Sequence, residues 1–84
     1  MLVVAYSLIK VDSGKDARVF AIVRRREEVK EVAITYGAYD LLAKVEVKAP
    51  EELDAFIYDV LRRMPEVKET TTLIASRIEA GVHV

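Results

Sequence analysis

The sequence contains no cysteine, no tryptophan, no asparagine and no glutamine, and its single histidine is His83. Without cysteine, disulfide bridges, thiolate metal sites and cysteine nucleophiles are excluded. One histidine cannot build the usual histidine-containing metal cluster, so we interpret His83 as a solvated residue near the end of the chain. The sequence therefore predicts neither a metal site nor a bound cofactor.

The missing side-chain amides stand beside a high content of charged residues, 32% of the chain. Proteins of thermophiles tend to avoid thermolabile Asn and Gln, and they favour networks of Glu, Lys and Arg. We therefore predict a thermophilic source.

The chain also lacks an excess of either charge sign and any long apolar run. It has 13 Lys and Arg against 14 Asp and Glu, a formal net charge of −1. Nucleic-acid binders are usually strongly basic, so direct DNA binding is not predicted. No apolar run reaches the roughly 18 residues that suggest a membrane span, and residues 1–13 lack the basic start of a signal peptide. We expect a cytoplasmic protein.

Few residues offer catalytic chemistry. The three serines have no accompanying base pattern for a nucleophile, and the three glycines are isolated, unlike a phosphate-cradling loop. The basic run 24–26 is followed directly by Glu27 and Glu28. We interpret this run as a solvated helix end, and we predict that the protein is not an enzyme.

A chain of 84 residues is predicted to form one domain, residues 1–84. A domain this short buries only about 60–65% of the surface that its unfolded chain exposes. It is therefore marginally stable alone and gains from association with another subunit.

Hydrophobic periodicity predicts four strands and two helices. β-Branched and aromatic residues favour strands, and Pro50 suits the first position of a helix. A capping box formed by Ser13 and Asp16 is expected to begin the first helix. In chain order the elements are a strand 2–11, a helix 14–28, strands 29–36 and 39–48, a helix 50–64 and a strand 67–78.

This β-α-β-β-α-β order is that of the α+β, ferredoxin-like fold. We expect a four-stranded antiparallel sheet in which the first and third strands are central and both helices cover one face. The helix 50–64 presents one apolar stripe at helical spacing. Its members are Leu53, Phe56, Ile57, Val60, Leu61 and Met64.

The second face of this sheet needs a cover, because the first strand is apolar on both sides. Val4, Tyr6 and Leu8 point one way, and Ala5 and Ile9 point the other. Burial of about six such side chains would contribute roughly 10 kcal/mol before the costs of association. We predict a dimer with sheets packed face to face; a monomer with exposed apolar residues is the alternative.

Two short motifs suggest ligand binding. A two-residue turn at Gly37 and Ala38 is expected to place Asp40 at the mouth of a hairpin, and Thr70 and Thr72 share one face of the last strand. Together they would offer an acceptor for an ammonium group and donors for a carboxylate, as a zwitterion requires. Both motifs also have plain structural interpretations, since threonine favours strands and aspartate stabilises turns.

Residues 36–78 resemble the C-terminal half of the leucine-responsive regulatory protein/AsnC (Lrp/AsnC) family of feast/famine transcription regulators. The family pattern G-x-Y-D appears at 37–40, and V-x-x-T-x-T appears at 67–72. The first strand and helix also fall where the family places them, so the resemblance covers essentially the whole chain.

The resemblance implies an amino-acid-sensing module known as the RAM domain, without catalytic activity. In the family this domain dimerises through its sheet, and dimers join into rings, often of eight or ten subunits. The effector amino acid binds between dimers, against the G-x-Y-D turn and the T-x-T strand. Matched by position, the implied ligand-binding residues are Gly37, Ala38, Tyr39, Asp40, Thr70 and Thr72, with Ala38 offering only its backbone.

The chain departs from the family in starting at the first strand, where full-length members carry a helix-turn-helix. It therefore looks like a stand-alone RAM protein that acts alone or co-assembles with a full-length AsnC-type regulator. A pure assembly protein that binds no ligand stays open, and so do two interpretations from other families. One is an ACT-like module, although Gly14 is a poor match to the glycine expected there; the other is a small dimeric α+β barrel protein, which usually needs a stronger acid–base group.

Overall fold

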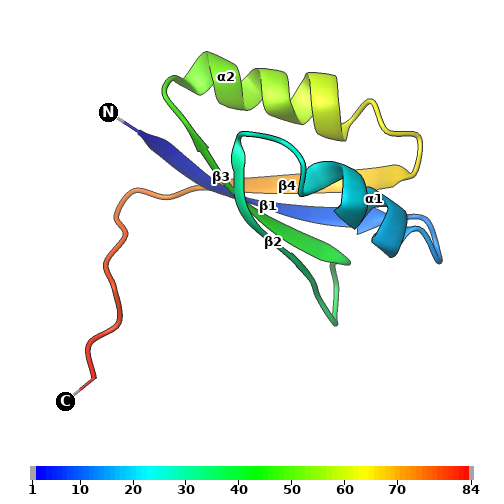
Figure 1. Ribbon diagram of the computed structural model, residues 1–84, viewed down its shortest axis with the longest axis horizontal. Coiled ribbons are helices and arrows are strands. Elements are labelled where there is room, and N and C mark those ends of the chain that lie inside the picture. Colours follow the sequence, from blue (N-terminus) through cyan, green and yellow to red (C-terminus); the bar gives the residue numbers. More distant parts are fainter. Residues whose placement is uncertain (1, 84) are drawn as a thin grey trace.

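The structure is a computed structural model that describes residues 2–83 (Figure 1). One four-stranded sheet has the strand order β2-β3-β1-β4, and every neighbouring pair is antiparallel. The predicted ferredoxin-like fold, with the first and third strands at the centre, is confirmed. The elements are β1 Val3–Val11, α1 Asp16–Val23, β2 Val29–Ile34, β3 Leu41–Val47, α2 Pro50–Ala55, η1 Phe56–Leu61 and β4 Val67–Ile74.

The hydrophobic core lies between one face of the sheet and both helices. Strict alternation on β3 places every second side chain in this core, as the sequence predicts. Ile9 of β1 and Phe56 of the second helix are almost completely buried in the same cluster. The core residues are Ala5, Ile9, Val11, Val19, Val23, Leu41, Ala43, Val45, Val47, Leu53, Phe56 and Leu61.

The first helix is shorter than the prediction of 14–28. It ends at Val23, because the chain then turns through hydrogen bonds from the Arg26 N–H to the Val23 oxygen and from the Val29 N–H to the Arg26 oxygen. The expected capping box is also wrong: Lys15 is the N-cap residue, and no side chain caps the helix. The basic run thus lies in the turn that leads into β2.

The second helix begins at Pro50, as expected, but its second half is a π-helix. The Arg62 N–H donates to the Ile57 oxygen, five residues back, at 2.9 Å. Such π-turns are rare and are frequent at functional sites. The predicted apolar stripe is confirmed, with Leu53, Phe56 and Leu61 buried and the other three members packed against them.

The connection between β2 and β3 is longer than the predicted two-residue turn. Ile34 and Leu41 form the last pair of the ladder, and the Thr35 N–H donates to the Asp40 oxygen at 2.9 Å. Residues 35–40 form a loop after this last pair. Tyr36, which the prediction placed at the end of the strand, is fully exposed and has no partner on β3. The last strand also stops early, at Ile74 rather than residue 78.

Among the described residues, no helix covers the second face of the sheet (Figure 1). Leu42 of β3 pairs with Leu8 of β1, and Leu8 pairs with Thr71 of β4, so these side chains share that face. We call it the open face; it also includes Leu73, which pairs with Tyr6 and is 56% exposed. Within residues 2–83, no helix is long and apolar enough to cross a membrane.

Candidate functional site

The two motifs that suggest a ligand lie at the same end of the sheet. Ile9 of β1 pairs with Leu41 on one side and with Thr70 on the other. The loop 35–40 ends next to Leu41, so it lies about two strand spacings, roughly 10 Å, from the start of β4. The end of β1 runs between them.

Asp40 closes the β1–β3 ladder from its side chain. Its Oδ2 accepts the Val11 N–H at 2.8 Å, and its own N–H donates to the Ile9 oxygen at 2.9 Å. Val11 lies two residues beyond Ile9, the last residue of β1 that pairs with β3, so the carboxylate replaces a strand carbonyl as acceptor. Asp40 thus has a structural partner within the chain.

Tyr39 leaves the loop toward the open face. Its hydroxyl lies 2.9 Å from the Thr71 hydroxyl, and the ammonium of Lys10 lies 5.3 Å from its ring centroid. The Thr35 hydroxyl donates to the Tyr39 carbonyl at 2.8 Å, which fixes the base of the loop. These contacts hold the aromatic ring across the end of β1.

Gly37 and Ala38 form the exposed tip of the loop. Gly37 has a φ of +119°, a backbone conformation that other residues rarely adopt. A Cβ placed there would meet no atom within 4 Å, so the glycine is needed for its conformation rather than for space. The tip leaves its backbone accessible.

Thr70 and Thr72 share a face, as predicted, and it is the face that the helices cover. Nε of Arg62 donates to Oγ1 of Thr70 at 3.0 Å, and the hydroxyls of Thr72 and the fully buried Ser7 lie 3.0 Å apart. Thr71 points to the opposite face. The six predicted residues therefore do not surround one pocket within a single chain.

The backbone of these two threonines points outward. The Ala75 N–H donates to the Val4 oxygen, which makes Ala5 and Ile74 a non-hydrogen-bonded pair. Alternation along the antiparallel ladder gives Thr70 and Thr72 the same status. Their N–H and C=O groups are directed to the outer edge of the sheet, since β4 is an edge strand.

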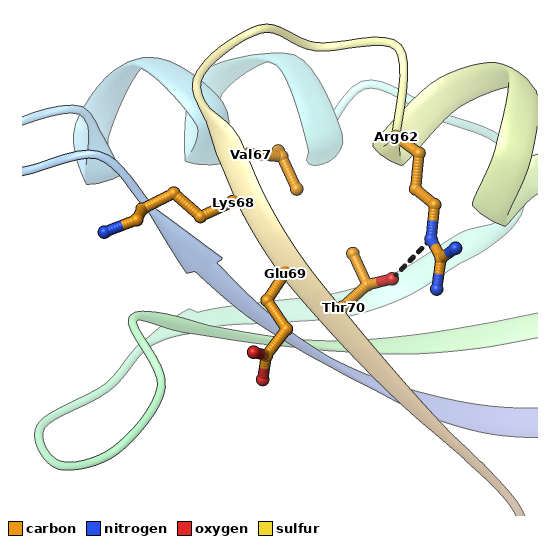
Figure 2. Close-up of a pocket in the computed structure, with 5 residues that line it drawn as sticks. All are labelled: Arg62, Val67, Lys68, Glu69 and Thr70. Carbon is orange, nitrogen blue, oxygen red and sulfur yellow. Dashed lines mark hydrogen bonds between the residues drawn. The ribbon is translucent and has the colours of Figure 1, made fainter.

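A hollow of about 370 Å³ lies beside this edge (Figure 2). Figure 2 shows Arg62 reaching from the end of the second helix to Thr70, while Lys68 and Glu69 point away from that pair. The sequence analysis missed Arg62, because a cation in the last helical turn is explained by the helix dipole. The lining residues are Arg62, Val67, Lys68, Glu69 and Thr70.

Glu66, in the turn before β4, is held in its ionised form. A hydrogen bond with its own backbone N–H and then a hydrogen bond from Arg18 of α1 lower the pKa of this carboxyl below its ordinary value of 4.5. The pKa of Glu28, before β2, is also lowered; burial raises it, but its backbone hydrogen bond and Arg26 outweigh that effect. Both carboxylates therefore fasten turns beside the sheet.

Within residues 2–83, no group of three or more His, Asp or Glu side chains lies close enough to share a metal ion. The site offers hydroxyls, backbone donors and acceptors, and one guanidinium. Such groups recognise a small polar ligand by hydrogen bonding.

Residues 4–79 match the family model described as the Lrp/AsnC ligand binding domain. Among curated proteins, the HTH-type transcriptional regulator FL11 of Pyrococcus abyssi is 43% identical over 53 residues, which are 63% of this chain and 35% of that protein. The match thus spans about a third of the length of this relative.

Solved structures share the fold. The hypothetical protein PHS023 from Pyrococcus horikoshii is 37% identical with a TM-score of 0.84, and the alignment covers 100% of both chains. The structure of FFRP-DM1 is 41% identical with a TM-score of 0.84, covering 87% of this chain and 97% of that one. A transcriptional regulator from Neisseria meningitidis, in complex with L-Met, is 22% identical with a TM-score of 0.81, covering 89% of this chain and 50% of that one.

Proposed function

Because the chain belongs to the Lrp/AsnC ligand binding domain family, whose members are regulatory and non-catalytic, we propose that it is a sensing module that binds a free amino acid. Family membership replaces the ACT-like and α+β barrel interpretations. The proposal concerns residues 4–79, the part of the chain that the family model covers.

The outer edge of β4 is the observation that carries this proposal. Thr70 and Thr72 each present an outward N–H and C=O group, and their hydroxyls lie on the same side of the sheet. An α-amino acid carries a carboxylate that needs donors and an ammonium that needs acceptors. A strand edge with both kinds of group offers a matching set.

The loop tip is proposed to complete the site from another copy of the chain. Within one chain, Gly37, Ala38 and Asp40 are separated from the edge by the end of β1, and Tyr39 reaches β4 at Thr71, on the open face. A neighbouring subunit can bring its own tip against the threonines. We therefore keep all six residues as proposed ligand contacts, divided between two copies.

Oligomerisation is a property of the family, and the specific assembly is part of the proposal. The open face would pair two subunits, because it exposes Leu73 beside partly exposed Tyr6, Leu8 and Leu42. Dimers would then join into an octamer or a decamer. A full-length AsnC-type regulator is a further proposed partner, since the FL11 relatives extend well beyond the matched segment.

The L-Met complex of the Neisseria regulator supports an amino acid as the class of ligand. At 22% identity, that structure is evidence for the fold alone, and its ligand belongs to that protein. The complex therefore guides the choice of probe without fixing which amino acid binds here.

A second candidate function is assembly without a ligand. One observation favours it: Asp40, Tyr39, Thr70 and Thr72 each already have a hydrogen-bond partner within the chain. These side chains could serve only to hold the loop and the edge in shape.

Isothermal titration calorimetry with each of the twenty amino acids tests the proposal. We expect heat from at least one, and we expect Thr70→Val to weaken its binding by about 5- to 10-fold, the value of one hydrogen bond. Ser13→Ala is the control, because it removes an exposed hydroxyl from the turn before α1, away from all six proposed contacts. Native mass spectrometry with the same ligand reports subunit number and stoichiometry.

Absence of heat and of bound ligand for all twenty amino acids, with an intact oligomer, would favour the assembly function instead. Unchanged affinity in Thr70→Val, or an equal loss in Thr70→Val and Ser13→Ala, would contradict the assignment of the ligand to the β4 edge.

A further inference from the structure

Arg62 takes its position from the π-turn. The bond from its N–H to the Ile57 oxygen spans five residues instead of four. One extra residue in the turn rotates all later side chains by about 100° relative to a continuous α-helix. The rotation brings Arg62 over β4, where its Nε donates to Oγ1 of Thr70 at 3.0 Å (Figure 2).

The guanidinium is held on two sides. Thr70 accepts from Nε, and the ring of Tyr58 lies 4.9 Å from the guanidinium carbon, one helical turn back. Stacking on an aromatic ring and a hydrogen bond at Nε together restrict a side chain that is otherwise flexible. Arg62 is therefore pre-oriented although it is exposed to solvent.

The two terminal nitrogens remain available. Among the hydrogen bonds and ion pairs of residues 2–83, none joins an Nη atom of Arg62 to a protein acceptor. The nearby carboxylate of Glu69 turns toward the other face and lies 4.0 Å from the ammonium of Lys10. The cation beside the hollow thus lacks a counter-charge from the described chain.

Thr70 adds a second donor at the same point. Its oxygen accepts from Arg62, so its own hydroxyl hydrogen is directed to a different acceptor. The backbone N–H of Thr70 is a further donor, because it is directed to the outer edge of the sheet. Guanidinium, hydroxyl and amide donors beside one open hollow match the two oxygens of a carboxylate.

We propose that Arg62, placed by the π-turn, binds the α-carboxylate of the amino acid ligand, with Thr70 donating to the same group. This inference rests on the proposed function and extends it to the ligand's charged end. The ammonium and the side chain of the ligand would then point away from the second helix, toward the neighbouring copy. The chemistry requires a free carboxylate, so an amino acid amide should be a poor ligand.

Calorimetry with the intact oligomer tests this inference. The probes are the amino acids, the primary amide of any that binds, and sodium acetate. The variants are Arg62→Gln, Arg62→Lys and Arg63→Gln; Arg63 is the adjacent exposed arginine and serves as the matched control. Thermal melts and native mass spectrometry confirm that each variant folds and assembles.

We expect Arg62→Gln to weaken amino acid binding by about 10- to 100-fold, as the loss of a charge-assisted hydrogen bond predicts. Arg62→Lys should recover part of this loss, and Arg63→Gln should change affinity less than 2-fold. The amide should bind the original protein as weakly as the acid binds Arg62→Gln, and it should lose little more in that variant.

The other outcomes separate the two proposals. Unchanged amino acid affinity in Arg62→Gln would overturn the role of Arg62 and leave the proposed function standing. Binding of acetate that depends on Arg62, with no amino acid bound, would retain the carboxylate site and overturn the amino acid function. No binding of any probe would overturn both.

Discussion

The two faces of the sheet are formed by the same strands but differ in burial. On the helix-covered face, Ile9, Leu41 and Val45 have no exposed surface. On the open face, their neighbours Leu8 and Leu42 are only half-buried. Alternation places apolar residues on both faces of β1. The helices of the same chain cover one face, and we propose that a second chain covers the other.

This comparison separates folding from assembly. Side chains that contact the helices contribute to the stability of one chain, because their burial does not require a partner. Side chains on the open face gain most of their burial from association. Substitutions on the two faces should therefore be read out by different measurements.

Phe56→Ala should have the largest effect on folding. Phe56 is 1% exposed at the start of the π-turn, so its truncation leaves a cavity between the second helix and the sheet. We expect a loss of about 3–5 kcal/mol in the free energy of unfolding, measured by guanidinium titration at fixed subunit concentration. Leu73→Ala, on the open face, is the comparison. An equal loss of unfolding free energy in both variants would contradict the conclusion that the helix-covered face contributes more to folding than the open face.

Leu8→Glu should affect assembly more than folding. A carboxylate at the centre of the proposed dimer interface would have to be desolvated, at a cost of several kcal/mol of association free energy. We expect sedimentation velocity to show smaller species at micromolar concentration, with the circular dichroism of a folded chain. Ile22→Glu, on the 39% exposed residue of α1, is the matched control. An unchanged oligomer in Leu8→Glu would exclude the open face as the interface.

Asp40 lies directly before β3 and bonds to β1, and two substitutions separate its structural role from its proposed role in ligand binding. Asp40→Ala leaves the Val11 N–H without its acceptor and should cost about 1–3 kcal/mol in unfolding free energy. Asp40→Asn keeps an acceptor oxygen and should cost less than about 1 kcal/mol. If Asp40 also contacts the ligand's ammonium, calorimetry should show weaker amino acid binding in Asp40→Asn. Unchanged affinity there would restrict Asp40 to its structural role.

Lowering the pH should produce the smallest effect on stability. It should act through the ion pair between Glu66 and Arg18 of α1, on the helix-covered face. The pKa of Glu66 is lowered in the folded chain. At pH values between the folded-state and unfolded-state pKa values, the folded state therefore binds fewer protons than the unfolded state. Its stabilisation is therefore complete above about pH 4.5 and is lost as pH falls through the lower folded-state value. Thermal melts should show a flatter acid limb for Glu66→Gln than for the original protein. Glu27→Gln is the control, and an identical limb in all three proteins would contradict the assignment.

Much of the fold was predictable because its signals are local. The alternation of β3 and the apolar stripe from Leu53 to Met64 each depend on spacing alone, and both are confirmed. Pro50 marked the start of the second helix for the same reason. The order of these elements was then enough to predict the antiparallel sheet with β1 and β3 at its centre.

The errors fall where neighbouring segments compete for the same backbone groups. The helix α1 ends at Val23 because the return to β2 uses the carbonyls that a longer helix would need. The hairpin does not close as a two-residue turn, and both the N–H and the carboxylate of Asp40 bond to β1. No local pattern records these choices.

The candidate site shows the same division. The spacing of Thr70 and Thr72 predicted that they share a face, but which face they share depended on pairing with β1. Arg62 gave no signal in the sequence beyond a cation near a helix end. Its approach to Thr70, eight residues later, depends on the π-turn and on the position of β4, which is set by pairing with β1.

The amino acid sequence by itself determined the order of the elements, the apolar faces and the family motifs, because each follows from residue types at short and regular spacing. The tertiary structure alone decided which polar groups are in contact, which face of the sheet stays open and where the guanidinium of Arg62 lies. Those outcomes depend on strand register and helix phase, which only long-range packing of the chain fixes.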